Sequence, residues 1–407
     1  PQKQGASDVA HVPPPLHRVR SLSPGGRGTG RGGSIARQRL NVTILPAPAY
    51  FTSGGCAAVM EIKLGKEHRR KLLKKQNVVG VGLGYRKKKG RKTREKAIIV
   101  FVTKKVAPQK LDKEEMAPRY LEGQRVDVIE IGEVRLLESC TPLVQNIPVD
   151  DRLARRRPAP GGVSIGHYRV TAGTLGAVVK DLQTGKRLIL SNNHVLANSS
   201  NGKDGRASIG DPVLQPGPYD GGSPDGDIIG RLERFAPIRA TFQSPSCTTA
   251  RFWEDLANRF LSAMLPHYRV NLQRANEEGN LVDAALAVPL REDDLSAELL
   301  ALGRISGVGE VYPGDDVCFS GRTSGVVGGS VVARDVSLYV TMEPGVDLYF
   351  IDQLVTTAVS RPGDSGSLLV DRENRAVGLL FAGSETVSIC NRFVNVSTLL
   401  GVEPVTG

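Results

Sequence analysis

The stretch from about residue 163 to 402 constrains the fold more than any other part of the sequence. Short apolar runs alternate there with turns rich in Gly, Pro, Asn and Asp. The clearest runs are Gly176 to Val179, Leu188 to Leu190, Ser330 to Ala333 and Ala376 to Phe381. Many short strands at such spacing predict a β-barrel or a β-sandwich. A glycine count of 46 and an aromatic content of 5% also favour a turn-rich, mainly β protein with an aliphatic core.

An insertion interrupts this pattern between residues 235 and 278. Within it, residues 250 to 265 are expected to form a helix, because apolar side chains recur there at helical spacing. These side chains are Phe252, Leu256, Phe260, Leu261 and Met264.

Three segments precede the β domain. Residues 1–59 are rich in Gly, Pro, Arg and Ser, a composition that buries little apolar surface and predicts disorder. The first methionine is Met60, and we interpret it as the native start of translation. Residues 60–138 predict a small basic α/β module. Residues 139–162, which are rich in Arg, Pro and Gly toward their end, predict a linker to the domain at 163–402.

The module is expected to contain one helix and three strands. We expect the helix from Glu61 to Lys75, strands from Val78 to Tyr85, Ala97 to Thr103 and Val126 to Ile131, and a basic turn from Arg86 to Lys92. The glycines of the first strand run GxGxG, without the GxGxxG spacing and the following helix of a dinucleotide site. They predict a strand packed closely against its neighbour, and no cofactor is expected.

Positive charge is concentrated near the N-terminus. The net charge is +12, and Lys and Arg outnumber Asp and Glu in residues 1–160, whereas the remainder is mildly acidic. A basic segment suits nucleic acid or another anionic surface. The alternative, which we favour, is a solvated and solubilising face, so nucleic acid is a secondary hypothesis for a partner.

The cysteines and the apolar runs bear on location. The five cysteines are odd in number and no two have CxxC spacing, which argues against a disulfide scaffold and against a zinc site. Unpaired thiols fit a reducing compartment. Residues 1–30 lack the apolar core of a signal peptide, and no apolar run reaches the roughly 18 residues of a membrane span. A cytoplasmic protein without a metal is expected.

His194 is the candidate general base. It follows the apolar run Leu188 to Leu190, just before a turn. A base for a serine hydroxyl must take and return a proton near neutral pH, which suits an imidazole. The other histidines lie in residues 1–59, among lysines, or without a flanking signature. A structural histidine is the alternative.

Asp283 is the candidate acid, because it is a lone carboxylate in the apolar run from 280 to 287. A carboxylate buried there needs a partner, and the Nδ1–H of His194 is the natural one. An aspartate capped by backbone amides is one alternative. Asp225 and Asp227 are rival acids, and we favour Asp283 because the rivals lie in a Gly/Pro loop.

Ser365 is the candidate nucleophile. It lies between Gly363 and Gly366 in the segment Arg-Pro-Gly-Asp-Ser-Gly-Ser that starts at residue 361. Glycines permit a tight turn and the close approach of a substrate. The N–H groups of Gly363 and Ser365 then point at one spot and make an oxyanion hole. Asp364 is interpreted as structural, and an ordinary hairpin turn is the alternative for the whole segment.

These three segments resemble the His, Asp and Ser motifs of trypsin-like serine peptidases with the chymotrypsin fold, in that family's chain order. The resemblance covers roughly residues 163–402. The strand from Asn77 to Tyr85 and the run from Val126 to Gly132 look like the module that precedes the peptidase domain in bacterial and narrow-leaf-type plant relatives.

The resemblance implies a fold of two six-stranded antiparallel β-barrels with a helical insertion, preceded by the α/β module. It implies a serine endopeptidase that cleaves protein or peptide substrates without a cofactor. Ser365 is then the nucleophile, His194 the base and Asp283 its orienting acid. The oxyanion hole consists of Gly363 and Ser365.

The resemblance also implies a substrate pocket. Val359, six residues before the serine, is expected at its floor, and Phe381, Ala382 and Gly383 are expected to form a wall. None of them is a carboxylate, so small or medium apolar side chains are the expected preference. The alternative function is a peptidase-fold binding or scaffold protein with low or gated activity, recruited through its basic module. Assembly into a homo-oligomer is a further possibility.

Overall fold

The computed structural model describes residues 64–88, 91–137, 152–243, 247–265, 267–276 and 278–406. The segment 1–59, for which disorder is expected, and Met60 lie outside these ranges. The described part is mainly β, as expected, and none of its helices is long and apolar enough to cross a membrane. The division into two six-stranded barrels stays a prediction.

One sheet carries the histidine segment. Its eight strands pair in the order β25-β9-β10-β15-β12-β11-β7-β8. Their bounds are β7 (Ser164–His167), β8 (Gly173–Thr174), β9 (Ala177–Asp181), β10 (Arg187–Ser191), β11 (Pro212–Leu214), β12 (Ile228–Phe235), β15 (Ala285–Pro289) and β25 (Val402–Pro404). The short helix α2 (Asn193–Leu196) comes soon after β10. This sheet and α2 together are called the histidine half.

A second group of six strands surrounds the Ser365 turn and is called the serine half. The strands are β19 (Asp316–Gly321), β20 (Gly325–Glu343), β21 (Val346–Thr356), β22 (Leu368–Asp371), β23 (Arg375–Gly383) and β24 (Ser388–Arg392). Their pairings lead from β20 through β19, β22, β23, β24 and β21 back to β20. The helix α4 (Phe393–Leu400) follows β24. The four apolar runs identified in the sequence fall in β9, β10, β20 and β23, which confirms them as strands.

A buried apolar cluster joins the two halves. The histidine half contributes side chains from β9, β10 and β15, and the serine half contributes them from β22, β23 and α4. Members of the cluster include Ala177, Leu188, Leu286, Leu368, Leu379 and Phe393. Burial of one large apolar side chain stabilises a fold by about 1.5–3 kcal/mol. The cluster therefore fixes the halves, and the two parts of the candidate site, against each other.

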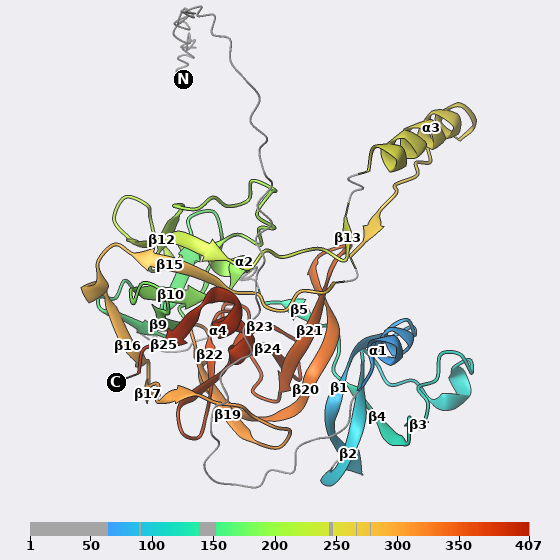
Figure 1. Cartoon of the computed structure of the whole chain (residues 1–407), viewed down its shortest axis with the longest axis horizontal. Helices are drawn as coiled ribbons and strands as arrows, with labels where there is room; N and C mark the ends of the chain where they lie inside the picture. Colours follow the sequence, from blue (N-terminus) through green and yellow to red (C-terminus); the bar gives the residue numbers. More distant parts are fainter. Residues whose placement is uncertain are drawn as a thin grey trace, which may run out of the picture. The chain divides into compact units, whose positions relative to one another are not determined.

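The N-terminal module continues the sheet of the serine half. Its elements are α1 (Lys66–Leu73), β1 (Val78–Lys88), β2 (Arg91–Val102), the 3-10 helix η1 (Pro108–Lys110), β3 (Tyr120–Leu121), β4 (Gln124–Glu130) and β5 (Arg135–Leu136). β1 pairs antiparallel with β20, and the sheet goes on through β2, β4 and β3 (Figure 1). The module and the two halves thus belong to one compact unit.

The basic turn expected from Arg86 to Lys92 is shorter than predicted. β1 extends to Lys88 and β2 begins at Arg91, with Lys88 opposite Arg91 in the ladder. The physical reason is that strand pairing satisfies backbone groups that a longer turn would leave open. The helix, expected from Glu61 to Lys75, extends from Lys66 to Leu73, and residues 61–63 lie outside the described part.

The glycines of β1 allow close contact with β20. A methyl group on Gly82 would lie 2.5 Å from Val336 Cγ2, and one on Gly84 would lie 2.7 Å from the Val332 carbonyl oxygen. A side chain has no room at either position. The interpretation of the GxGxG run as a closely packed strand is confirmed.

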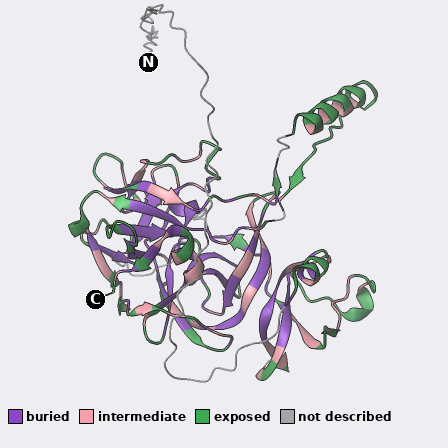
Figure 2. Ribbon diagram, viewed as in Figure 1, coloured by how far each residue is buried: buried purple, intermediate pink, exposed green. Residues whose placement is uncertain are grey.

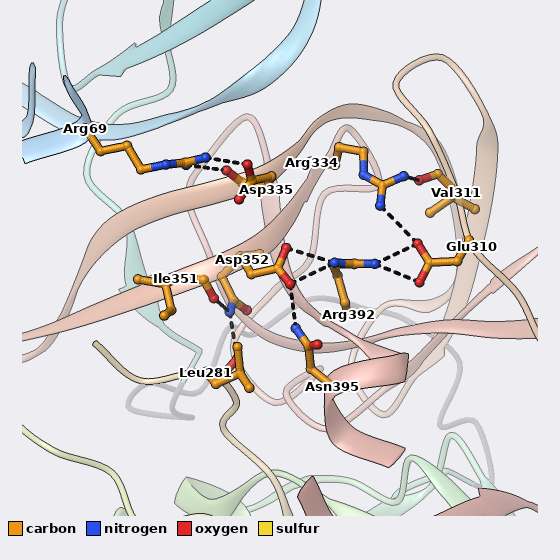
Figure 3. A network of polar contacts seen from close by, with 11 residues as sticks. Arg69, Leu281, Glu310, Val311, Arg334, Asp335, Ile351, Asp352, Arg392 and Asn395 are labelled. Atoms are coloured by element: carbon orange, nitrogen blue, oxygen red, sulfur yellow. Dashed lines mark hydrogen bonds and ion pairs between the residues drawn. The ribbon is translucent and has the colours of Figure 1, made fainter. Parts of the chain in front are cut away.

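Ion pairs attach the module to the serine half, and further ion pairs link strands within the serine half. Arg69 of α1 donates a hydrogen bond of 2.6 Å to the Asp335 carbonyl oxygen and also pairs with the carboxylate of Asp335 in β20 (Figure 3). Arg392 at the end of β24 lies between two acids, 2.7 Å from Asp352 and 2.8 Å from Glu310. These contacts link α1, β20, β21 and β24.

The second part of the predicted linker is an ordered and buried piece of the fold. β6 (Ala159–Gly161) pairs in parallel with β16 (Leu295–Leu299). Arg152 is buried, and its Nη1 donates to Ser320 Oγ at 2.7 Å. The segment is ordered because strand pairing and the arginine satisfy its polar groups. Residues 138–151, which include most of the first part, lie outside the described residues.

The insertion contains the expected helix as α3 (Thr248–Met264), together with β13 (Phe242–Gln243), which pairs with β14 (Arg274–Ala275). No residue of α3 is buried, and Figure 2 shows the helix exposed or half-buried along its length. The remaining elements are η2 (Pro218–Asp220), η3 (Glu292–Asp294), β17 (Gly303–Arg304) and β18 (Gly307–Val308).

Candidate active site

His194 and Asp283 form a buried pair in the histidine half. Because β10 pairs with β15, with Ser191 opposite Ala285, the segment that follows β10 meets the segment that precedes β15. His194 Nδ1 lies 2.6 Å from Asp283 Oδ2, and the exposed fractions of the two side chains are 2% and 0%. This distance is that of a strong, charge-assisted hydrogen bond.

Backbone and amide groups hold Asp283 in place. Its Oδ1 accepts the backbone N–H of Asn193 at 2.7 Å and that of His194 at 3.3 Å. Its own N–H donates to Asn391 Oδ1 at 3.0 Å, and its carbonyl oxygen accepts Asn192 Nδ2 at 2.7 Å. A buried carboxylate is stable only where hydrogen bonds replace water, and these bonds do so. Asn391 lies in β24, so one of them reaches across from the serine half.

The rival acids have other environments. Asp227 accepts the N–H of Ser223 at 2.9 Å and lies 3.2 Å from Arg155 Nε, whereas Asp225 is exposed in the same loop. Asp283 is the acid whose carboxylate contacts His194.

The Ser365 turn uses glycines for their backbone angles. Gly363 has φ +97° and Gly366 has φ +92°, values in the left-handed region that favours glycine. A methyl group on Gly366 would lie 2.1 Å from Ser191 Oγ and 2.3 Å from the Thr174 carbonyl oxygen. Glycine is thus needed at residue 366 both for its angle and for its size.

The carboxylate of Asp364 stabilises the turn through hydrogen bonds from backbone N–H groups. Its Oδ1 accepts the N–H groups of Thr323 and Ser324, both at 2.9 Å, and its Oδ2 accepts that of Arg361 at 2.8 Å. Complete burial raises the pKa of Asp364, against the opposing effect of these hydrogen bonds. These bonds from three backbone N–H groups agree with its interpretation as structural.

Strand β8 of the histidine half connects the His194 segment with the Ser365 turn. The Thr174 N–H donates to the Ser365 carbonyl oxygen at 2.7 Å, and Ser191 Oγ donates to the Thr174 carbonyl oxygen at 2.7 Å. A methyl group on Gly173 would lie 2.4 Å from Val195 Cγ2 and 2.9 Å from the Ser365 carbonyl oxygen. Val195, the residue after His194, and Ser365 therefore flank the same glycine.

The candidate oxyanion donor is already engaged by the chain itself. The Gly363 N–H donates to the Leu137 carbonyl oxygen at 3.1 Å. Ser365 Oγ lies 3.4 Å from the same oxygen and 3.3 Å from the Phe381 carbonyl oxygen. Ser365 is 1% exposed, so the candidate nucleophile is covered.

The residues expected around the pocket differ in exposure. Phe381, Ala382 and Gly383 end β23 and are buried, and the Phe381 carbonyl contacts Ser365. Val359 is 37% exposed, whereas Ala358 is 1% exposed and packs in the apolar cluster that contains Leu137. Ala358 is therefore the buried residue at this point, whereas Val359, expected at the pocket floor, is more than a third exposed.

Two residues of the site carry no signal in the sequence. Asn391 contacts Asp283 but lies 108 residues from it, and Leu137 contacts Ser365 but lies 228 residues from it. No motif surrounds either of them. Only the strand pairing β5–β23 and the register of β24 would have revealed them.

The described cysteines, Cys247, Cys318 and Cys390, are free, and Cys56 and Cys140 lie outside the described part. Burial raises the pKa of the Cys390 thiol. Within the described ranges, no cluster of three or more His, Cys, Asp or Glu side chains has the arrangement of a metal site.

In sequence, the chain is similar to a plant protein. A family model described as the NARROW LEAF 1 N-terminal domain matches residues 57–131. Protein NARROW LEAF 1 of Oryza sativa subsp. japonica is 27% identical over 335 residues, which cover 75% of this chain and 51% of that protein. The chain thus spans about half the length of the curated relative it matches.

In structure, the chain is similar to serine proteases. A glutamic acid specific serine protease shares 17% identity at a TM-score of 0.38, and covers 61% of this chain and 100% of its own. Protease A of Thermobifida fusca shares 15% identity at a TM-score of 0.38, with 61% and 98% covered. The MamO protease domain of Magnetospirillum magneticum shares 14% identity at a TM-score of 0.30, with the same coverage.

Proposed function

We propose that the protein is a serine endopeptidase that cleaves peptide bonds through Ser365, His194 and Asp283. The observation that carries the proposal is the buried hydrogen bond of 2.6 Å between His194 Nδ1 and Asp283 Oδ2. A carboxylate at this distance accepts the Nδ1 proton and stabilises the imidazolium that forms when the ring takes up a second proton. Nε2 of the neutral ring then carries the lone pair that a base needs.

The reaction then follows the acyl-enzyme route. Ser365 Oγ attacks the carbonyl carbon of the substrate while its proton passes to His194 Nε2. The negative charge that develops on the carbonyl oxygen is stabilised by the Gly363 N–H and, in the proposal, by the Ser365 N–H. The protonated His194 gives its proton to the leaving amine. Water, activated by the same imidazole, releases the acyl group and restores the serine.

The contacts of Gly363 support its part in this route. Its N–H already donates to a peptide carbonyl oxygen, that of Leu137, at 3.1 Å. The same oxygen lies 3.4 Å from Ser365 Oγ. A donor and a nucleophile that converge on one carbonyl are the arrangement that acyl transfer requires.

The second candidate function is a peptidase-fold binding protein with low or gated activity. The exposed fraction of Ser365, 1%, favours it, because a nucleophile must be reached by its substrate. The two candidates differ in whether the chemistry occurs once a peptide has access. Recruitment through the basic module, self-association and a cytoplasmic location remain proposals alongside either function.

Digestion of a denatured peptide library, read by mass spectrometry, tests the proposal. We expect cleavage after small or medium apolar residues, and no cleavage by the Ser365→Ala variant. Cleavage mainly after Arg or Lys would contradict the proposed pocket. Equal cleavage by the wild type and the Ser365→Ala variant would assign the activity to a contaminant.

A further inference from the structure

Ser365 Oγ contacts Leu137, the residue that follows strand β5 of the same chain. β5 pairs antiparallel with β23, with Leu136 opposite Ala382 and Arg135 opposite Gly383. These positions of β23 follow directly on Phe381, whose carbonyl oxygen contacts Ser365 Oγ. An extended peptide that adds to the edge of a sheet is a common mode of peptide recognition. β5 therefore occupies the edge on which an extended peptide would lie beside Ser365.

The backbone of Leu137, the residue after β5, contacts the candidate catalytic groups. The Leu137 N–H donates to the Phe381 carbonyl oxygen at 3.5 Å, and the Leu137 carbonyl oxygen accepts the Gly363 N–H at 3.1 Å. Ser365 Oγ lies 3.4 Å from that carbonyl oxygen. The backbone of Leu137 thus uses the oxyanion donor and the nucleophile at once.

The side chain of Leu137 is buried in an apolar site. It is 7% exposed and belongs to the cluster that includes Ala358 and Leu380. A methyl group on Gly383 would lie 3.4 Å from Leu137 Cδ2 and 3.0 Å from Ser360 Oγ. Gly383 and Ser360 therefore border the space that the leucine fills. A space of this kind suits a side chain of leucine size without charge.

β5 is fixed on its other side as well. The Thr341 N–H in β20 donates to the Val134 carbonyl oxygen at 3.0 Å. Val134 and Leu136 are both buried in the core that β20, β21 and β23 share. Because it is attached to the same chain, the strand competes with a free peptide at a high effective concentration.

We propose that residues Val134 to Leu137 are a built-in substrate mimic, whose Leu137 occupies the primary pocket and oxyanion position that an external peptide must take over. The inference rests on the proposed function for its meaning, because it regulates that same site. It also names the substrate class: an extended segment with a medium apolar residue at the bond to be cleaved. Activity toward other chains then requires that Leu137 leave its pocket.

Binding in a catalytically dead background tests this inference. The Ser365→Ala variant is the reference, and the probe is a fluorescent peptide of sequence Val-Arg-Leu-Leu-amide, which copies residues 134–137. Leu137→Gly is added to empty the pocket, and Leu137→Met is the matched control that keeps it filled. Fluorescence anisotropy gives the dissociation constant of the peptide for each protein.

We expect the Gly variant to bind the peptide at least about tenfold more tightly than the reference, because one buried leucine side chain is worth that factor or more. The Met variant should stay close to the reference, since methionine replaces leucine at similar volume. Equal affinities for the Gly and Met variants, or no binding by either, overturn the inference.

A second measurement covers the case in which the Gly variant fails to fold. Hydrogen exchange of residues 134–137 is measured in the Ser365→Ala variant, in which Leu137 is kept. The exchange rates with and without a large excess of the peptide are compared. Faster exchange with peptide supports displacement, and unchanged exchange overturns it. Neither readout needs catalysis. A protein that never cleaves a peptide can therefore support the inference, and an active peptidase can fail it.

Discussion

The two halves of the candidate site are stabilised in different ways. In the histidine half, the residues that hold Asp283 come mostly from the neighbouring segment at Asn192 to His194. In the serine half, the turn at Ser365 is held from three distant places: by the Thr174 N–H, by the Leu137 carbonyl oxygen, and by the N–H groups of Thr323 and Ser324, which bind the Asp364 carboxylate within the turn. The residues Asn192 to His194 lie 89–91 residues from Asp283 in the sequence. Both halves therefore join remote segments, but Asp283 is held mainly by one of them, whereas the Ser365 turn is held by several.

This difference between the two halves indicates where regulation can act. A pair buried to 2% and 0% exposure and held by adjacent backbone has little room to change. The Ser365 turn, in contrast, shares its key N–H and hydroxyl groups with Leu137, which an external peptide is able to replace. Access to the serine half, and not the geometry of the histidine half, is thus the step that we expect to limit activity.

The largest effect is expected when the His194–Asp283 pair of the histidine half is disabled without unfolding the protein. In Asp283→Asn, the negative charge that stabilises the protonated His194 is lost. The amide can also donate to Nδ1, which favours the tautomer with the proton on Nε2, and this tautomer cannot act as the base. We expect kcat for peptide hydrolysis to fall by about 10⁴-fold. Steady-state kinetics with a fluorogenic peptide measures it, and circular dichroism checks the fold. A loss below about tenfold would mean that Asp283 does not orient the base.

The second prediction concerns the packing of the serine half against the histidine half. Gly366→Ala places a methyl group against Ser191 and Thr174, so the free energy of unfolding should fall by about 2–5 kcal/mol from strain and overpacking together. Gly210→Ala is the matched control, because Gly210 has φ +93° and no atom within 4 Å of the added methyl group. It should cost about 1–2 kcal/mol. Equal losses in urea unfolding would contradict the close contact.

The third prediction concerns the hydrogen bonds that cross between the halves. Asn391→Ala leaves the buried N–H of Asp283 without its acceptor, which should cost about 1–3 kcal/mol of unfolding free energy and lower kcat. Asn395→Ala serves as the control, because its amide contacts Asp352 on the far side of the serine half. A change in urea unfolding no larger than that of the control would show that the crossing bond is unimportant.

The smallest effect is a pH dependence that belongs to the histidine half. His167 in β7 is buried with Nε2 3.1 Å from Asp211 Oδ2, and burial lowers its pKa in the folded protein. Below about pH 6.5, His167 therefore binds a proton in the unfolded chain more readily than in the folded chain. Between pH 7.5 and 5.5, we expect the wild type to lose up to about 1.4 kcal/mol more unfolding free energy than His167→Gln. Equal losses in urea unfolding would contradict a neutral buried imidazole.

Local sequence was sufficient to expect the contact between His194 and Asp283 that the structure has. The sequence predicted His194 at the end of a strand, whereas β10 ends at Ser191 and His194 lies in α2. Asp283 was found because a lone acid in an apolar run needs a partner. The helix of the insertion was equally visible, because its apolar spacing is a local property. The mainly β class followed from strand and turn spacing in the same way.

The surroundings of Ser365 could not be predicted, because strand periodicity does not specify which strands pair. Leu137 lies in a segment that reads as the end of a module and the start of a linker, yet β5 pairs with β23. The exposure of Val359 and the burial of Ala358 depend on the path of the chain into the turn. The number of residues between Val359 and Ser365 does not specify that path. Asn391 was missed because nothing in β24 distinguishes its inward side chain from an ordinary strand polar residue.

Labelling with a fluorophosphonate probe, followed by intact mass spectrometry, shows whether Ser365 is an activated nucleophile. The probe phosphonylates only a serine that is activated as a nucleophile. We expect one label on the full chain, which is lost in Ser365→Ala and strongly reduced in His194→Ala. Labelling should be faster in Leu137→Gly than in Leu137→Met. The absence of a label on Ser365 even in Leu137→Gly, in protein that is folded, would contradict the assignment of a serine peptidase.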